Sequence, residues 1–133
     1  MRSPKAKILI LDEDLQSRGE TRVLLDAAGY DACICETASE SLSLIRNYRP
    51  DCLLLNLRVP AELEGKPFLP HVRGQFPDLA IVAYTNTTEF SKHDLIKANV
   101  CFIVQKPFSL NLFLNTIERA LNEQSPQLKR TAA

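Results

Sequence analysis

The chain has 133 residues, which suits one domain that can bury a core of its own without disulfides or metals. Its 16 basic residues are balanced by 16 acidic residues, so the formal net charge is zero. The lack of a positive field counts against a nucleic-acid-binding protein, and no apolar run approaches the length of a membrane span. We therefore expect a cytoplasmic protein that binds neither nucleic acid nor a membrane.

The first predicted strand is the apolar run at residues 7–11, in which apolar and polar residues do not alternate. Such a run indicates a strand that is buried on both faces, as in a parallel sheet. The strand stops at an acidic cluster that begins with Asp12 and Glu13. A helix is predicted over residues 15–28, because Asp14 can cap its first turn.

The third predicted strand is the apolar run that follows Pro50 and ends at Asn56, its one polar residue. Before it, residues 30–35 form a less apolar strand that suits a sheet edge, and residues 38–47 form a helix. The remaining predicted elements are a short helix at 67–75, a strand at 79–84, a helix at 89–98, a strand at 102–105 and a helix at 110–122.

Five strands that alternate with five helices predict a parallel sheet covered by helices on both faces. We expect the α/β fold to be a flavodoxin-like (βα)5 three-layer sandwich with strand order 2-1-3-4-5. Residues 1–122 would form this domain, and the polar residues 123–133 would form a frayed tail. In this order the loops after strands one, three, four and five converge, and they begin with Asp12 and Glu13, Asn56, Thr85 and Lys106.

Two acids, a hydroxyl and a lysine at one sheet edge suit a divalent cation together with a phosphoryl group. A carboxylate at the end of the third strand could attack phosphorus and form an acyl phosphate. Asn56 cannot do so, because a neutral amide is a poor nucleophile and brings no negative charge to a cation. We therefore expect no cofactor other than Mg²⁺, and we expect Mg²⁺ binding to be weak or lost.

These motifs resemble the receiver domain of two-component response regulators, the CheY-like family, over roughly residues 7–122. The resemblance places Asp12 and Glu13 at the family's acidic pair. It places Asn56 at the phosphoacceptor aspartate and Arg58 where a backbone carbonyl binds the metal. The resemblance thus implies a receiver fold whose acceptor position carries an amide in place of an acid.

The same resemblance extends to the last two strands of the domain. Thr85 matches the switch hydroxyl, and Lys106 matches the lysine of the family's Lys-Pro pair. Counting back from Lys106 puts Ile103, with Phe102 beside it, at the position of the switch aromatic. In the family, a histidine kinase donates the phosphoryl group, and the modified domain rearranges its fourth helix, fifth strand and fifth helix.

Three functional classes remain open. The favoured one is an atypical stand-alone receiver, or pseudo-receiver, whose conformation is fixed by a partner or by hydrogen bonds among Asp12, Asn56, Thr85 and Lys106. It would act without phosphorylation and without enzymatic activity. The second is a receiver that still takes a phosphoryl group from a histidine kinase, because Asn56 replaces a natural aspartate or another acid substitutes for it. The third, a flavodoxin-like cofactor binder, lacks a glycine-rich phosphate loop.

The expected partner is a protein, either a histidine kinase or another signalling protein, and a homodimer is the alternative. By resemblance, the partner would bind the face made by the fourth helix, the fifth strand and the fifth helix. Leu112 lies off the core stripe of the last helix and is expected to be exposed on that face. The predicted stripe consists of Leu110, Phe113, Leu114, Ile117 and Leu121.

Overall fold

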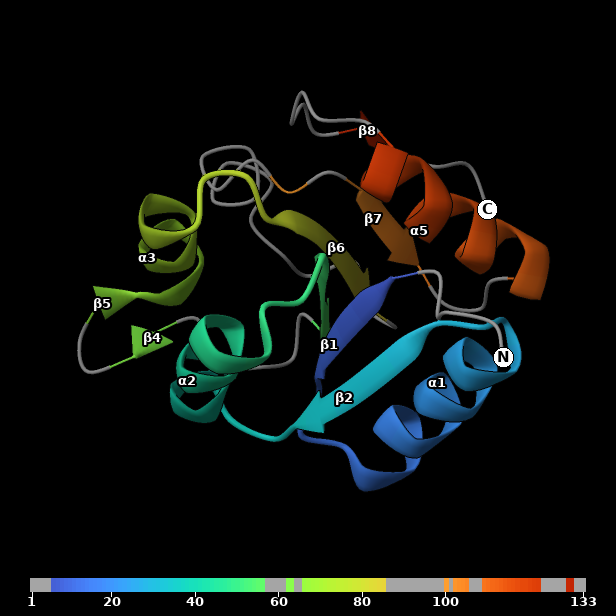
Figure 1. Ribbon diagram of the computed structural model, residues 1–133, viewed down its shortest axis with the longest axis horizontal. Helices are drawn as coiled ribbons and strands as arrows, with labels where there is room; N and C mark the ends of the chain where they lie inside the picture. Colours follow the sequence, from blue (N-terminus) through green and yellow to red (C-terminus); the bar gives the residue numbers. More distant parts are fainter. Residues whose placement is uncertain are drawn as a thin grey trace.

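The computed structural model describes residues 6–56, 62–63, 66–85, 100, 102–105, 109–122 and 129–130. These residues form a six-stranded sheet, and all of its neighbouring strands are parallel (Figure 1). Its strands, in spatial order, are β2 (Asp31–Cys35), β1 (Lys7–Leu11), β3 (Cys52–Asn56), β6 (Ala80–Thr85), β7 (Phe102–Gln105) and β8 (Lys129–Arg130). The first five are the predicted strands, so the predicted order 2-1-3-4-5 is confirmed.

The sixth strand, β8, differs from the frayed tail that the composition of residues 123–133 indicates. It pairs with the edge strand β7, where Lys129 lies opposite Phe102 and Arg130 lies opposite Ile103. An edge strand offers unpaired N–H and C=O groups, and an extended segment can satisfy them without an apolar pattern of its own. Patterns based on side chains therefore do not detect such a strand.

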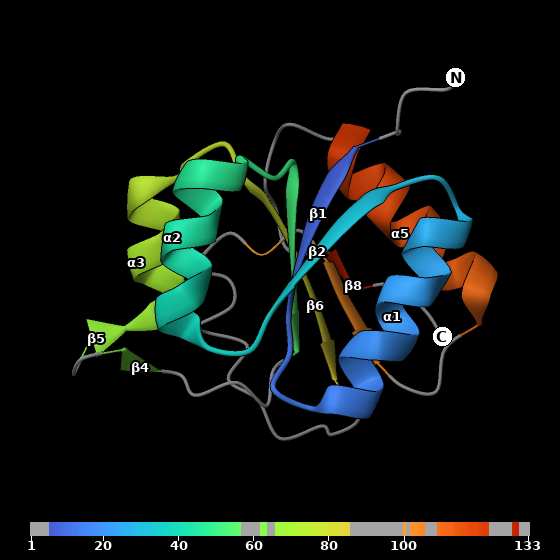
Figure 2. The same cartoon turned by 60° about the horizontal axis from the view of Figure 1, so that its bottom comes forward.

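Helices cover both faces of the sheet. Figure 2 shows α2 (Ala38–Tyr48) and α3 (Phe68–Gln75) on one side, and α1 (Leu15–Ala27) and α5 (Leu110–Asn122) on the other. These four helices are confirmed within one or two residues of their predicted ends, whereas the predicted helix at 89–98 lies outside the described residues. Within the described ranges, no helix is long and apolar enough to cross a membrane.

Local signals account for the ends of the helices. The side chain of Asp14 accepts hydrogen bonds from the backbone N–H groups of Gln16 and Ser17, which caps α1 as predicted. Helix α3 begins at Phe68, one residue later than expected. The preceding residues Lys66–Pro67 form β5, which pairs antiparallel with β4 (Glu62–Leu63), where the sequence predicts no strand.

The sheet divides the core into two clusters, because successive side chains of a strand point to opposite faces. Leu9, Leu53 and Ile81 belong to the cluster on the α2 and α3 side. Their neighbours Ile8, Leu54 and Val82 belong to the cluster on the α1 and α5 side. The completely buried apolar runs of β1 and β3 thus supply both clusters, as the lack of alternation in their sequences predicts.

Helix α5 departs from its predicted core stripe at one end. Phe113 and Ile117 are buried, and Leu114 and Leu121 pack against their cluster. Leu110 is 48% exposed, so its inclusion in the stripe was wrong. Leu110 is the first residue of the helix. It directly follows the N-cap residue Ser109, whose hydroxyl accepts a hydrogen bond from the N–H of Leu112.

Candidate functional site

The strand ends bring two of the predicted site residues together. Strands β1 and β3 are paired in parallel register, so Asp12, directly after β1, and Asn56, the last residue of β3, lie at the same edge of the sheet. Thr85 ends β6 at this edge too, although its side chain lies outside the described residues. Arg58 and Lys106 also lie outside the described part of the chain.

Asp12 is completely buried, and Asn56 is 5% exposed. The Asn56 side-chain amide donates a hydrogen bond from Nδ2 to Oδ1 of Asp12 over 3.0 Å. The backbone N–H of Asp14 donates to the same oxygen over 2.9 Å. A buried carboxylate is costly unless donors surround it, and these two donors satisfy one of its oxygens.

The second oxygen of Asp12 accepts a hydrogen bond from the hydroxyl of Tyr84. Tyr84 is 1% exposed, and its ring belongs to the core cluster on the α1 and α5 side. It lies directly opposite Asn56 in the register of β3 and β6. Sequence reasoning missed this residue, because it counts as one more apolar member of a buried strand. The available signal was a tyrosine, which needs a hydrogen-bond partner when buried, next to a strand end.

Burial raises the pKa of Tyr84, and the hydrogen bond to Asp12 and the charge of that carboxylate raise it further. The neighbouring hydroxyls of Ser17 and Thr21 act in the opposite direction, but the net shift is upward. Tyr84 therefore keeps its proton at ordinary pH and acts as the donor to Asp12.

The other two acids of the predicted acidic cluster lie at the surface. Glu13 is exposed, and the side chain of Asp14 caps α1. In the part of the chain that the structure describes, no three side chains of His, Cys, Asp or Glu lie close enough together to hold a metal ion. The described part of the site thus consists of one buried carboxylate that accepts hydrogen bonds from three donors.

The two residues at the predicted switch position point to opposite faces of β7. Phe102 is completely buried on the α1 and α5 side, with the guanidinium of Arg119 5.1 Å from the centre of its ring. Ile103 is 6% exposed and packs in the cluster on the α2 and α3 side. Neither side chain is therefore available at the surface in this conformation.

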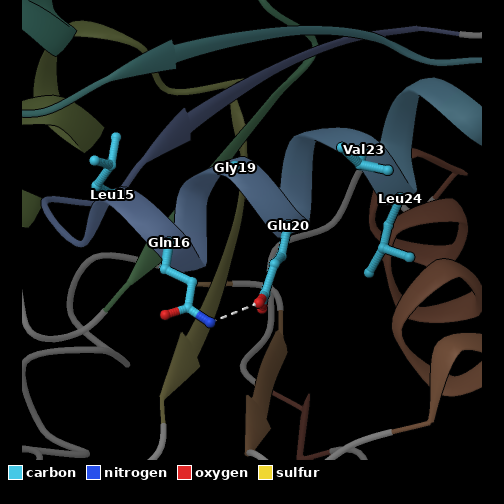
Figure 3. A pocket seen from close by; sticks show the side chains of 6 residues that line it. All are labelled: Leu15, Gln16, Gly19, Glu20, Val23 and Leu24. Atoms are coloured by element: carbon cyan, nitrogen blue, oxygen red, sulfur yellow. Dashed lines mark hydrogen bonds between the residues drawn. The ribbon is translucent and has the colours of Figure 1, made fainter.

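A surface hollow lies along α1, and Figure 3 shows the side chains that line it. Leu15 and Val23 are 73% and 67% exposed, and Gly19 lies one helical turn from each of them. A methyl group added at Gly19 would meet nothing within 4 Å, so internal packing does not require glycine there. The side chains of Leu15 and Val23 therefore do not contribute to the core. The remaining lining residues are Gln16, Glu20 and Leu24.

All three tyrosines are expected to ionise at a higher pH in the folded protein than in the unfolded chain. Burial is the main cause of each upward pKa shift, and the acids Glu118 and Asp31 raise the pKa of Tyr30 and Tyr48 further. The folded state then holds protons that the unfolded chain releases. This contribution to stability is complete below about pH 10 and is lost as the pH rises towards the folded-state pKa values.

Tyrosinate absorbance at 295 nm would measure this difference. At about pH 10 the native protein should absorb much less than the same protein in urea, where half of the tyrosines are ionised. Urea titrations at higher pH should show a falling free energy of unfolding. Superimposable native and urea titrations would contradict the burial of these hydroxyls.

Comparison with known proteins agrees with this architecture. The family model described as "Response regulator receiver domain" matches residues 8–118. Response regulator MprA from Mycobacterium sp. (strain KMS) is 30% identical over 121 residues, which cover 90% of this chain and 52% of that relative. The chain therefore spans about half the length of the MprA proteins that it matches.

Two further relatives are similar over nearly their whole length. The polar-differentiation response regulator DivK from Brucella anthropi is 25% identical over 123 residues, covering 90% of this chain and 98% of DivK. The crystal structure of a CheY-like receiver domain protein from Methanospirillum hungatei JF-1 matches with a TM-score of 0.76 at 26% identity. That match covers 89% of this chain and 94% of the other. The chain therefore belongs to the family of response regulator receiver domains.

Proposed function

We propose that this receiver domain works without phosphorylation, as a cytoplasmic module of two-component signalling that binds another protein. The observation that carries the proposal is the hydrogen bond from the Asn56 amide to the buried Asp12 carboxylate. Asn56 is the last residue of β3, and from this place we infer that it stands where the receiver family carries its phosphoacceptor aspartate. The site then serves to stabilise one conformation.

The chemistry of the amide supports this assignment. A phosphoacceptor must attack phosphorus with a negatively charged oxygen, and an amide offers none. The Asn56 nitrogen lies 3.0 Å from Asp12. A second carboxylate at that distance would repel the first unless a cation lay between them. The amide removes this repulsion and makes a hydrogen bond instead, so the pair is stable without a cation.

The arrangement also fits a resident divalent cation poorly. Mg²⁺ requires near-octahedral oxygen ligands and usually keeps several waters. Among the residues that the structure describes, the site offers one buried carboxylate, and each of its oxygens already accepts at least one hydrogen bond from the protein. We therefore propose that the domain operates without Mg²⁺.

The proposed partner is a histidine kinase or another signalling protein. The relatives of this chain, MprA and DivK, are named as response regulators. The exposed Leu15 and Val23 of α1 add apolar surface of the kind found at protein–protein contacts. On α5, Leu112 is half-buried and not exposed as expected. The helix predicted at 89–98, which would form part of the expected partner or homodimer face, lies outside the described residues.

Intact mass measurement after incubation with acetyl phosphate and Mg²⁺ tests the proposal. The chain should show no phosphoryl adduct, because Asn56 supplies no nucleophilic oxygen. A receiver domain with an aspartate acceptor, treated in parallel, serves as the positive control. An adduct that disappears in alkaline hydroxylamine would identify an acyl phosphate and overturn the proposal in favour of a phosphorylatable receiver.

A further inference from the structure

The carboxylate of Asp12 is held from two sides by side chains of neighbouring elements. Asn56 reaches Oδ1 from the end of β3, and Tyr84 reaches Oδ2 from β6. The N–H of Asp14 adds a third donor from the turn before α1. The amide at position 56 accounts for only one of these three hydrogen bonds. The hydroxyl of Tyr84 is an independent feature of this chain.

We propose that Tyr84 is a positioning residue that closes the acidic site to divalent cations by holding the second oxygen of Asp12. The proposal rests on the proposed function and deepens it, because it gives the receiver a second barrier to cation binding. Restoring an acid at Asn56 would then not be enough to restore tight cation binding. The Tyr84 hydroxyl would have to be removed as well.

The packing of Tyr84 supports this role. Its ring is fixed in the core cluster that also contains Val82, Phe102 and Phe113, so the hydroxyl cannot move aside without disturbing that cluster. A hydrogen bond to a carboxylate is among the stronger ones in proteins. A cation that binds Asp12 through Oδ2 would have to displace this donor or share the oxygen with it, and the donor comes from a side chain that is completely buried.

The size of the effect follows from competition. Cation affinity is measured relative to the free protein, and any contact that the cation must break lowers that affinity. Loss of one hydrogen bond to a charged group should therefore tighten binding by about tenfold to a hundredfold. A hydroxyl that only fills the core would leave cation affinity unchanged, which separates positioning from simple packing.

Calorimetric titration with MgCl₂ tests the proposal on the full chain. The single variant Asn56→Asp supplies a second carboxylate. The double variant adds Tyr84→Phe, which removes the hydroxyl and keeps the aromatic ring. The double variant should bind Mg²⁺ at least about tenfold more tightly than Asn56→Asp alone. Equal affinities, or no measurable binding by either variant, would overturn the proposal.

A matched control is available at the other end of the sheet. The hydroxyl of Tyr48 donates to the backbone carbonyl of Asp31 over 2.9 Å, at the start of β2. Asn56→Asp with Tyr48→Phe also loses a tyrosine hydroxyl bond, but far from Asp12, and should bind Mg²⁺ like Asn56→Asp. An equal gain in affinity in this control would show general loosening of the domain and would contradict the role of Tyr84.

A second measurement keeps the test valid if Asn56→Asp does not fold, which circular dichroism would show. Tyr84→Phe is then compared with the unmodified chain, and Mn²⁺ binding is followed by water proton relaxation. The variant should bind Mn²⁺ more tightly by the same factor, and equal binding would overturn the proposal. Phosphorylation of the unmodified chain would instead contradict the proposed function, so the two failures are distinguishable.

Discussion

Replacing Asp12 by alanine is expected to destabilise the domain by about 3–5 kcal/mol. The reason is that three donors lose their acceptor inside the protein: the N–H of Asp14, the amide of Asn56 and the hydroxyl of Tyr84. Each buried polar group that is left without a partner costs about 1–3 kcal/mol. Urea unfolding at pH 7, followed by circular dichroism, would measure the loss.

The sign of this result is informative. In a site with several unneutralised carboxylates, removal of one acid relieves repulsion and stabilises the fold. In this domain Asp12 faces donors, so its removal should destabilise. Asp12→Asn is the matched control. It keeps an acceptor oxygen for Asn56 and should lose clearly less stability than Asp12→Ala. An alanine variant as stable as the unmodified chain would contradict the donor arrangement.

Replacing Phe113 by alanine is expected to cost about 3–5 kcal/mol, the typical loss for a buried phenylalanine. Phe113 is 1% exposed and lies in the cluster that joins α5 to the sheet. The truncation would leave a cavity between this helix and the strands, because the surrounding side chains relax only partially. Thermal and urea unfolding of the variant would both report the change.

Leu110 provides the control on the same helix. It is 48% exposed, so Leu110→Ala should change the free energy of unfolding by no more than about 0.5 kcal/mol. Similar losses for the two variants would mean that α5 contacts the sheet through a different face. The pair also tests the correction to the predicted core stripe, which had included Leu110.

The fold follows closely from local sequence patterns. Uninterrupted apolar runs at residues 8–11 and 52–55 predict strands buried on both faces, and these residues of β1 and β3 are buried in this way. Caps at Asp14 and Ser109 predict where helices begin, because capping depends on a few adjacent residues. Strand β8 is different, since a partner strand distant in the sequence determines it.

The site was predictable only in part. The end of an apolar strand and the parallel order place Asn56 near Asp12, and the structure brings them together. A buried tyrosine near a strand end needs a hydrogen-bond partner, but Asp12 could not be assigned as that partner, because the contact depends on the register between β3 and β6. Nor does the sequence show that Glu13 is exposed while its neighbour is buried.

The bond between Tyr84 and Asp12 also gives the domain an optical signal of its own. The chain contains no tryptophan and three tyrosines, so tyrosine dominates its ultraviolet emission. A carboxylate that accepts a hydrogen bond from a phenol quenches its fluorescence, and Tyr84 should therefore be dark while the contact with Asp12 is intact. Binding of a partner that separates the two groups would brighten the protein without any attached dye.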